Sequence, residues 1–211
     1  MKTIIQKQTR KIVLFIFAFF AVTSCQKEQT ANAAKDQQLH KNISIAALQE
    51  FQQAIFQNSR IAQADYVYLL GEEPIEGPDE TMAPNGDIIT LAGSGTFSIN
   101  PKSVTGSGWF KHTNASGAVL GMGTWSAIQL ISFHSYGNSF PDVPAELEGG
   151  LALIRVHLSP AAGGPGFDAV LQIDCLLGNP PAGSHEGIRL SIQDVINFNK
   201  EVEGETVFIR L

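Results

Sequence analysis

The chain has 211 residues, of which 44% are hydrophobic and 16% are charged. These proportions are typical of one globular domain and argue against a disordered tail or a repeat array. Because the formal net charge is −6 at pH 7, the chain offers no basic footprint for nucleic acid, and we expect no nucleic-acid partner.

Residues 1–24 have the features of an export signal. Basic residues lie between Lys2 and Lys11, and an apolar run over residues 12–22 follows them. This run is too short to span a bilayer as a stable helix, but it suits the core of a signal peptide. It ends in Val22-Thr23-Ser24-Cys25, which resembles the lipobox of bacterial lipoproteins. The resemblance implies that the sulfur of Cys25 carries diacylglycerol and that the chain is cleaved before this residue.

A lipidated Cys25 predicts a protein of the bacterial cell envelope, anchored to a membrane by acyl chains. The sequence leaves open whether the protein faces the periplasm or the outer surface. Residues 25–42 are polar, and we interpret them as a tether. An ordinary secretory signal with an incidental cysteine is the alternative. With Cys25 lipidated, Cys175 has no disulfide partner and is expected to be a buried, unreactive thiol.

We expect residues 43–211 to form a single β-rich globular domain that begins with one helix. Apolar residues recur at spacings of three and four near its start, which predicts an N-terminal amphipathic helix: Ile45, Leu48, Phe51 and Ile55. The segment from Gly71 to Gly86 is rich in Pro, Gly and acidic residues, and we expect a solvated loop there.

Most of the domain has the alternation of strand-forming and turn-forming segments that is typical of a β protein. Runs of strand-forming residues alternate with clusters of Gly, Pro, Asn and Ser. The expected strands are 66–70, 87–99, 104–113, 118–133, 150–158, 168–177, 187–193 and 205–211. About eight strands predict a mainly β fold, a small antiparallel β-barrel, with a two-sheet β-sandwich as the alternative.

Three neighbouring strands share the motif Gly-x-Gly-x-aromatic, and strand periodicity places the motif residues of each strand on one face. They are Gly93, Gly95 and Phe97, then Gly106, Gly108 and Phe110, then Gly121, Gly123 and Trp125. Turns at residues 100–103 and 114–117 would align three rows across the sheet. The rows are Phe97–Gly106–Trp125, Gly95–Gly108–Gly123 and Gly93–Phe110–Gly121.

In this register every aromatic ring of the lattice faces a glycine. Rings can cover bare glycine backbone, and glycines let strands coil tightly, so we interpret the lattice as a curved barrel wall. A groove where a ligand contacts the glycine backbone is the alternative. The pattern resembles the strands of dirigent and allene-oxide-cyclase barrels. No catalytic residue matches those families, so the resemblance carries no activity to this chain.

Polar residues alternate with apolar ones on two later strands. Arg155 and His157 share one face of the first strand, and Gln172 and Asp174 share one face of the second. If the strands are neighbours, these four residues form a polar strip. Inside a barrel the strip would be a ligand-facing or acid–base site, because His titrates near neutral pH and Asp can orient it. On the outside it would be the solvated face of the sheet.

The remaining histidines show no metal-ligand spacing, and no catalytic motif is present, so we expect no metal, no cofactor and no assigned catalytic residue. The main hypothesis is a non-catalytic binding or interaction module of the envelope. Its partner would be a small apolar or amphipathic ligand, or an envelope protein. A barrel enzyme using His157 and Asp174 and a purely structural envelope protein are the alternatives. An inward-facing Arg155 and His157 would favour a ligand or an enzyme, and an outward-facing pair would favour the structural role.

Overall fold

The computed structural model of the protein describes residues 64–71, 77–138 and 143–211. Cys25 and the predicted export signal, tether and helix over residues 45–55 lie outside these ranges. The regular structure in the described ranges is β-strand, with no helix among them. The described ranges therefore contain no helix that is long and apolar enough to cross a membrane.

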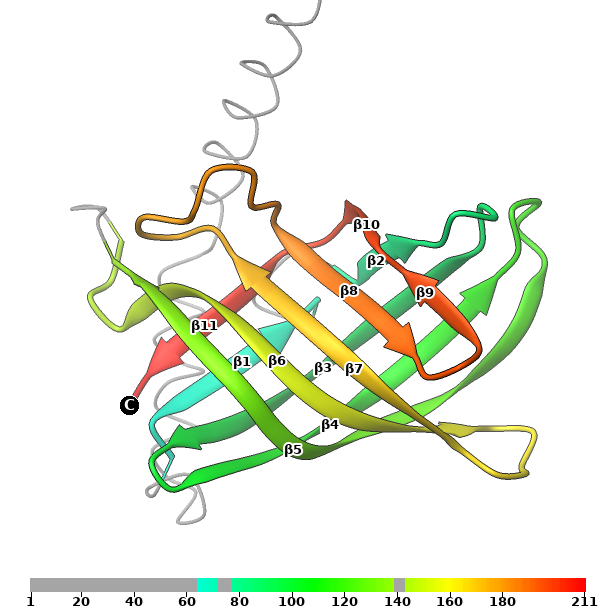
Figure 1. Ribbon diagram of the computed structural model, residues 1–211, viewed down its shortest axis with the longest axis horizontal. Helices are drawn as coiled ribbons and strands as arrows, with labels where there is room; N and C mark the ends of the chain where they lie inside the picture. The colour runs from blue at the N-terminus through cyan, green and yellow to red at the C-terminus, as the bar shows by residue number, and fades with distance from the viewer. Residues whose placement is uncertain (1–63, 72–76, 139–142) are drawn as a thin grey trace, which may run out of the picture. The chain divides into compact units, whose positions relative to one another are not determined.

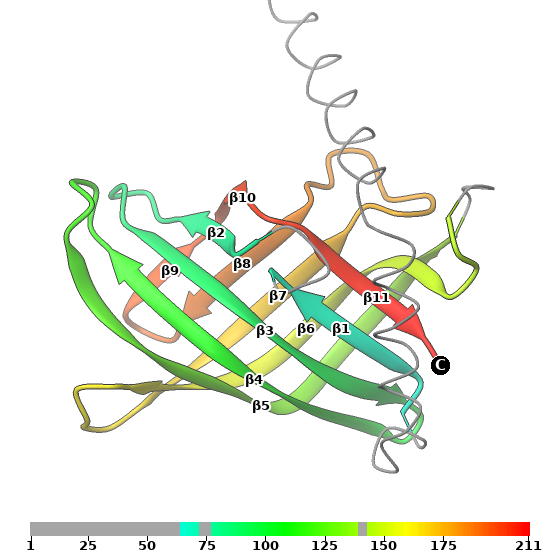
Figure 2. The same ribbon diagram turned by 180° about the vertical axis from the view of Figure 1, so that it is seen from behind.

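Eleven strands form one antiparallel sheet (Figures 1 and 2). In chain order they are β1 (Tyr66–Leu70), β2 (Asp79–Met82), β3 (Ile88–Ile99), β4 (Lys102–Thr113), β5 (Val119–Gly137), β6 (Leu147–Pro160), β7 (Phe167–Cys175), β8 (Gly187–Ile192), β9 (Ile196–Phe198), β10 (Lys200–Glu203) and β11 (Thr206–Arg210). The expectation of a mainly β, antiparallel fold is confirmed.

Six of the strands make a partial ring, so the fold is not a regular eight-stranded barrel. Neighbouring pairs run from β1 through β3, β4, β5, β6 and β11, and β11 pairs with β1 again. The long strands β3 and β6 each have two partners in succession on one edge. β3 pairs with β2 and then with β1, and β6 pairs with β11 and then with β7. The sheet therefore divides, and β2–β10 and β7–β8–β9 extend beyond the ring.

Aromatic side chains fill the interior of the ring. The ring centroids of Tyr66 and Phe97 lie 5.0 Å apart, and Phe133 lies 4.9 Å from Phe97 and 5.1 Å from Phe208. Tilted and edge-to-face pairs at these separations are favourable contacts for aromatic rings. The space enclosed by β1, β3, β5 and β11 is thus occupied by packed side chains.

The register predicted for the glycine–aromatic lattice is wrong by two residues. The first hairpin closes over Asn100 and Pro101 alone, so Ile99 lies opposite Lys102. Phe97 therefore faces Val104 and not Gly106. The sequence Asn-Pro-Lys-Ser identifies a turn, but turn-forming composition does not fix the length of the loop.

The second hairpin departs from the prediction in the same way. A bulge between His112 and Thr113 shifts the pairing, so Phe110 faces Gly123 and Trp125 faces Gly108. None of the three predicted rows exists as drawn. A bulge adds one unpaired residue to a strand, and the sequence carried no signal for its position.

Aromatic rings nevertheless cover glycines, with different partners from those predicted. A Cβ atom added to Gly106 would lie 2.0 Å from the hydroxyl oxygen of Tyr68, and one added to Gly108 would lie 2.5 Å from Nε1 of Trp125. Gly121, by contrast, has nothing within 4 Å of such an atom. Tyr68 on β1, which the sequence motif did not include, supplies one of the rings.

Part of the segment expected to be a solvated loop is ordered sheet. Within residues 71–86, Asp79–Met82 forms β2, and Asp79 and Thr81 are completely buried. The short strands β9 and β10 were also not predicted. All three strands are only three or four residues long, so they are too short to show an alternating pattern.

Candidate functional site

The four residues of the predicted polar strip lie on the outer face of two neighbouring strands. β6 and β7 are neighbours, and Arg155, His157, Gln172 and Asp174 occupy the face opposite the buried Ile154 and Val156. Arg155 is exposed, and the side chain of His157 is 40% exposed. The strip does not line the ring interior.

The carboxylate partner of His157 is Asp168, not Asp174. Nδ1 of His157 lies 2.8 Å from Oδ1 of Asp168, which is its direct neighbour across the strands. Asp174 lies opposite Leu151, six residues from His157 along β6. At about 3.3 Å per residue the two groups are roughly 20 Å apart, which is far beyond hydrogen-bonding distance.

A shallow pocket of about 420 Å³ adjoins the His157–Asp168 pair and is also lined by Gly166, Phe167, Gln193 and Asp194. The strand alternation that placed Gln172 and Asp174 on one face also applies to Asp168. The sequence therefore held the signal for this pair, which the prediction did not use.

Asp174 is almost fully buried, unlike its neighbours on the strip. Desolvation raises the pKa of this carboxyl to about 6, and the nearby carboxylate of Glu201 acts in the same direction. A hydrogen bond from Tyr136 and the positive charge of Arg189 oppose the shift. Asp174 is a buried member of the outer face, so it is not available to a ligand in solution.

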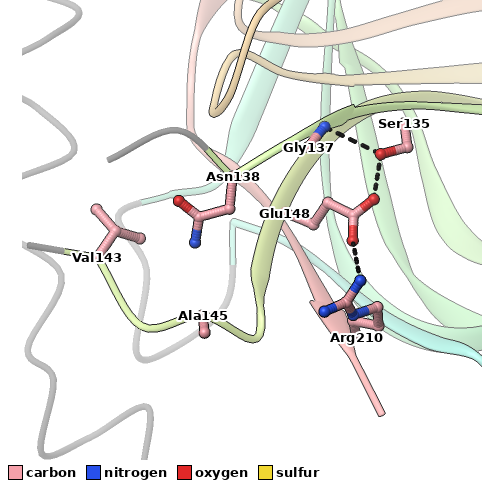
Figure 3. Close-up of a pocket in the computed structure, with 7 residues that line it drawn as sticks. All are labelled: Ser135, Gly137, Asn138, Val143, Ala145, Glu148 and Arg210. Carbon is pink, nitrogen blue, oxygen red and sulfur yellow. Dashed lines mark hydrogen bonds and ion pairs between the residues drawn. The ribbon is translucent and has the colours of Figure 1, made fainter. Parts of the chain in front are cut away.

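A larger pocket, of about 560 Å³, opens at the rim of the ring (Figure 3). It is formed where the end of β5, the start of β6 and the end of β11 come together. The residues that line it are Ser135, Gly137, Asn138, Val143, Ala145, Glu148 and Arg210. All of these residues except Arg210 lie within residues 135–148, so the pocket forms where β11 brings Arg210 beside the end of β5 and the start of β6.

Glu148 is the centre of the hydrogen bonds in this rim pocket. The residue is only 6% exposed. Its Oε1 accepts a hydrogen bond of 3.2 Å from the hydroxyl of Tyr66 and another from the hydroxyl of Ser135. Its Oε2 lies 3.7 Å from Nη1 of Arg210 (Figure 3). Both carboxylate oxygens therefore have positioned partners, which compensates the burial of the charge.

The hydroxyl groups around Glu148 are oriented as donors. Burial, followed by the nearby charge of Glu148, raises the pKa of Tyr66 to about 12, so this hydroxyl keeps its proton at neutral pH. The oxygen of Ser135 accepts a 3.0 Å hydrogen bond from the backbone N–H of Gly137. Its own hydrogen is then directed to Glu148. The polar groups that line the pocket are hydroxyl, amide, carboxylate and guanidinium groups, all of which can hydrogen-bond a ligand.

Comparisons with known protein families, with curated proteins and with solved structures found no match. The site is therefore interpreted from its own chemistry. Within the described ranges, no three His, Cys, Asp or Glu side chains are placed to hold a metal ion.

The rim pocket offers an acceptor and a donor to a ligand. Glu148 accepts hydrogen bonds at the buried side, while the side chain of Arg210 is 60% exposed and retains N–H groups that point to solvent. A ligand with both donors and acceptors, such as the backbone of a polypeptide, matches these groups. Sequence reasoning missed the pocket because an isolated glutamate and a C-terminal arginine form no motif.

Proposed function

We propose that the chain is a lipid-anchored, non-catalytic binding module of the bacterial cell envelope, and that it binds a segment of an envelope protein at the rim pocket. The carrying observation is Glu148, a buried carboxylate held by Tyr66, Ser135 and Arg210 at an open pocket. A few fixed polar groups in a concave site are the usual basis of specific binding.

We place the partner on the surface of the domain because aromatic side chains occupy the ring interior. This packing argues against binding of a small apolar ligand inside the ring. The outward-facing Arg155 and His157 also remove the reason to place a ligand there. An enzyme based on His157 and Asp174 has no support from the register, since the two residues lie on different rows of the sheet.

A purely structural envelope protein is the second candidate, because it needs no interior cavity. The outward orientation of Arg155 and His157 favours it over an interior binding site. The two candidates differ in one respect. A binding module has a saturable partner at the rim pocket, and a structural protein has none.

Site-specific photo-crosslinking in cells that produce the full chain distinguishes them. A photoreactive amino acid replaces Ala145, which lines the rim pocket and is exposed, and in a separate variant it replaces Ile128, which is exposed on β5 outside the pocket. We expect a discrete protein adduct at position 145 that is absent at position 128. The adduct should disappear when Arg210→Ala is added. Equal labelling at both positions, or an adduct indifferent to Arg210→Ala, would overturn the proposal.

Native mass spectrometry of the purified mature domain addresses the interior-ligand alternative. We expect the mass of the polypeptide alone. A copurified small apolar molecule would show that the domain binds its ligand in a different way from the one proposed here.

A further inference from the structure

Three carboxyl groups, two of them buried and one partly buried, gather where the β2–β10 pair meets β8 and the start of β11. Asp79 lies on β2, Glu186 directly precedes β8, and Glu205 directly precedes β11. Asp79 is 0% exposed and Glu205 is 2% exposed. Neither oxygen of the Asp79 carboxyl has a hydrogen-bond partner. We call these three residues, Asp79, Glu186 and Glu205, the acidic seam.

The backbone closes directly over the seam. A Cβ atom added to Gly204 would lie 2.2 Å from Oδ1 of Asp79, so the loop between β10 and β11 packs on the carboxyl itself. A glycine at this position, with φ of +113°, allows the approach. Water is excluded from Asp79 as long as this contact persists.

Glu186 connects two strands through its carboxyl group. Its Oε2 accepts a 2.6 Å hydrogen bond from the N–H of Leu176, directly after β7. Its Oε1 accepts a 3.0 Å hydrogen bond from the N–H of Thr206, the first residue of β11, and lies 2.7 Å from the hydroxyl of the same residue. Glu186 therefore links the end of β7 to the start of β11, and these two strands pair in succession with one edge of β6.

The described charged groups around the seam are of both signs. The groups that act on Asp79 are the carboxyls of Glu186 and Glu205, and both disfavour its ionisation. β3 contributes apolar Ile89 and Leu91 on the Asp79 side. From the remaining elements come Asp174 and Cys175 of β7, His185 before β8, Arg189 of β8, and Lys200, Glu201 and Glu203 of β10. Arg189 pairs with Glu201, and Lys200 and Glu203 are exposed.

Burial raises the pKa of Asp79 well above its usual range, and it raises the pKa of Glu186 to about 8. Glu186 thus keeps its proton at neutral pH, and ionisation of Asp79 is disfavoured. Like charges in a site of low dielectric repel strongly once the protons are lost.

We propose that the acidic seam is a proton-dependent latch that holds the β2–β10 pair against β8 and β11 while its carboxyls are protonated and releases the pair when they ionise. The geometry favours release of this pair over opening of the ring. β2 is hydrogen-bonded to the rest of the sheet over Ile88–Leu91 of β3, whereas β3 and β4 pair along their full length.

The expected dependence on pH follows from linkage. A group whose pKa is raised in the latched state binds its proton more tightly there than in the released state. For Glu186 the released-to-latched ratio should therefore rise about tenfold for each pH unit between 4.5 and 8. Asp79 adds a dependence of the same sign.

Hydrogen exchange of backbone amides, followed by mass spectrometry from pH 5 to pH 9, tests the latch. Rates are divided by those of an unstructured peptide at the same pH, which removes the intrinsic effect of pH on exchange. We expect protection of Asp79–Met82 and Lys200–Glu203 to fall by at least tenfold as the pH rises, and we expect β4 to exchange more slowly than this pair at every pH. In Asp79→Asn the fall should be smaller. Glu203→Gln, an exposed change on the same pair, should behave as the wild type.

Asp79→Asn retains the size of the side chain, and Glu205→Gln provides a second test if the first variant fails to fold. Protection of β2 and β10 that does not change with pH would overturn the latch. Equal exchange rates in β4 and in the β2–β10 pair at every pH would also overturn it, because that outcome describes unfolding of the whole domain. The latch would also be overturned if Asp79→Asn and Glu205→Gln both fold and retain the full wild-type dependence of protection on pH.

Discussion

The hydroxyl group of Tyr68 lies over Gly106, at a point where any larger residue would collide with it. The ring comes from β1, crosses the glycines of β3 and β4, and donates a 3.0 Å hydrogen bond to the carbonyl of Thr105. A Cβ atom on Gly106 would lie 2.0 Å from the Tyr68 oxygen, well inside the sum of their van der Waals radii. The contact joins β1 to β4, a strand with which it does not pair, and so it stabilises the partial ring.

Gly106→Ala should therefore destabilise the domain. Tyr68 is completely buried and has little room to move, so we expect a loss of about 2–4 kcal/mol in the free energy of unfolding. Urea denaturation followed by tryptophan fluorescence measures it. Gly121→Ala is the matched control, because nothing lies within 4 Å of its added methyl group, and it should change stability by less than about 0.5 kcal/mol. Equal effects of the two changes would contradict the contact.

The lipid anchor gives a prediction that does not depend on the fold. If Cys25 carries diacylglycerol, cells fed an alkyne-bearing fatty acid should label the protein, and Cys25→Ser should abolish the label and release the chain from the membrane fraction. Cys175→Ser, which removes the buried thiol, should remain labelled. Labelling that survives in Cys25→Ser would show that the cysteine is incidental to an ordinary secretory signal.

The strand pattern was readable from the sequence because the long strands alternate between polar and apolar residues. β3, β6 and β7 were placed to within a few residues. The closing partners were not readable. Tyr68 belongs to a strand with five buried residues and no alternation, and the two-residue hairpin after Ile99 is not encoded by composition alone. Pairings between strands that are distant in the sequence depend on packing that no local pattern records.

The same distinction between local patterns and long-range contacts applies to the functional residues. The strip of Arg155, His157, Gln172 and Asp174 was found because alternation on two adjacent strands is a local property. The rim pocket depends on Tyr66, Glu148 and Arg210, which come from three separate parts of the chain. Neighbouring residues give none of the three a distinctive context, so only the folded sheet shows that they meet.

Stability of the whole domain should fall as the pH rises through neutral values. The pKa of Glu186 in the folded chain, about 8, is above its ordinary value of 4.5, so the native state binds the proton more tightly than the unfolded state. This contribution is complete below about pH 4.5 and is lost as the pH rises toward 8, at about 1.4 kcal/mol for each pH unit. Asp174, with its pKa raised from 3.8 to about 6, adds a loss of the same sign over that lower range.

Urea denaturation at pH 5 and pH 8 checks this dependence, with Glu186→Gln as the diagnostic variant. Glutamine keeps an acceptor for one of the N–H donors and cannot ionise, so the difference between the two pH values should shrink. Asp194→Asn, an exposed carboxylate, should leave the difference unchanged. Greater stability of the wild type at pH 8 than at pH 5 would contradict the assigned direction.

The rim pocket allows binding and stability to be separated with two variants. Glu148→Ala leaves the buried hydroxyl of Tyr66 without its acceptor, and we expect a loss of about 1–3 kcal/mol in the free energy of unfolding. Arg210→Ala removes an exposed partner at 3.7 Å, and exposed ion pairs contribute about 0–1 kcal/mol, so the fold should be nearly unaffected. If the pocket binds a partner, Arg210→Ala should weaken crosslinking at position 145 while urea denaturation stays close to that of the wild type. An Arg210→Ala variant as unstable as Glu148→Ala would assign the arginine to the fold and would remove the pocket's free donor from the argument.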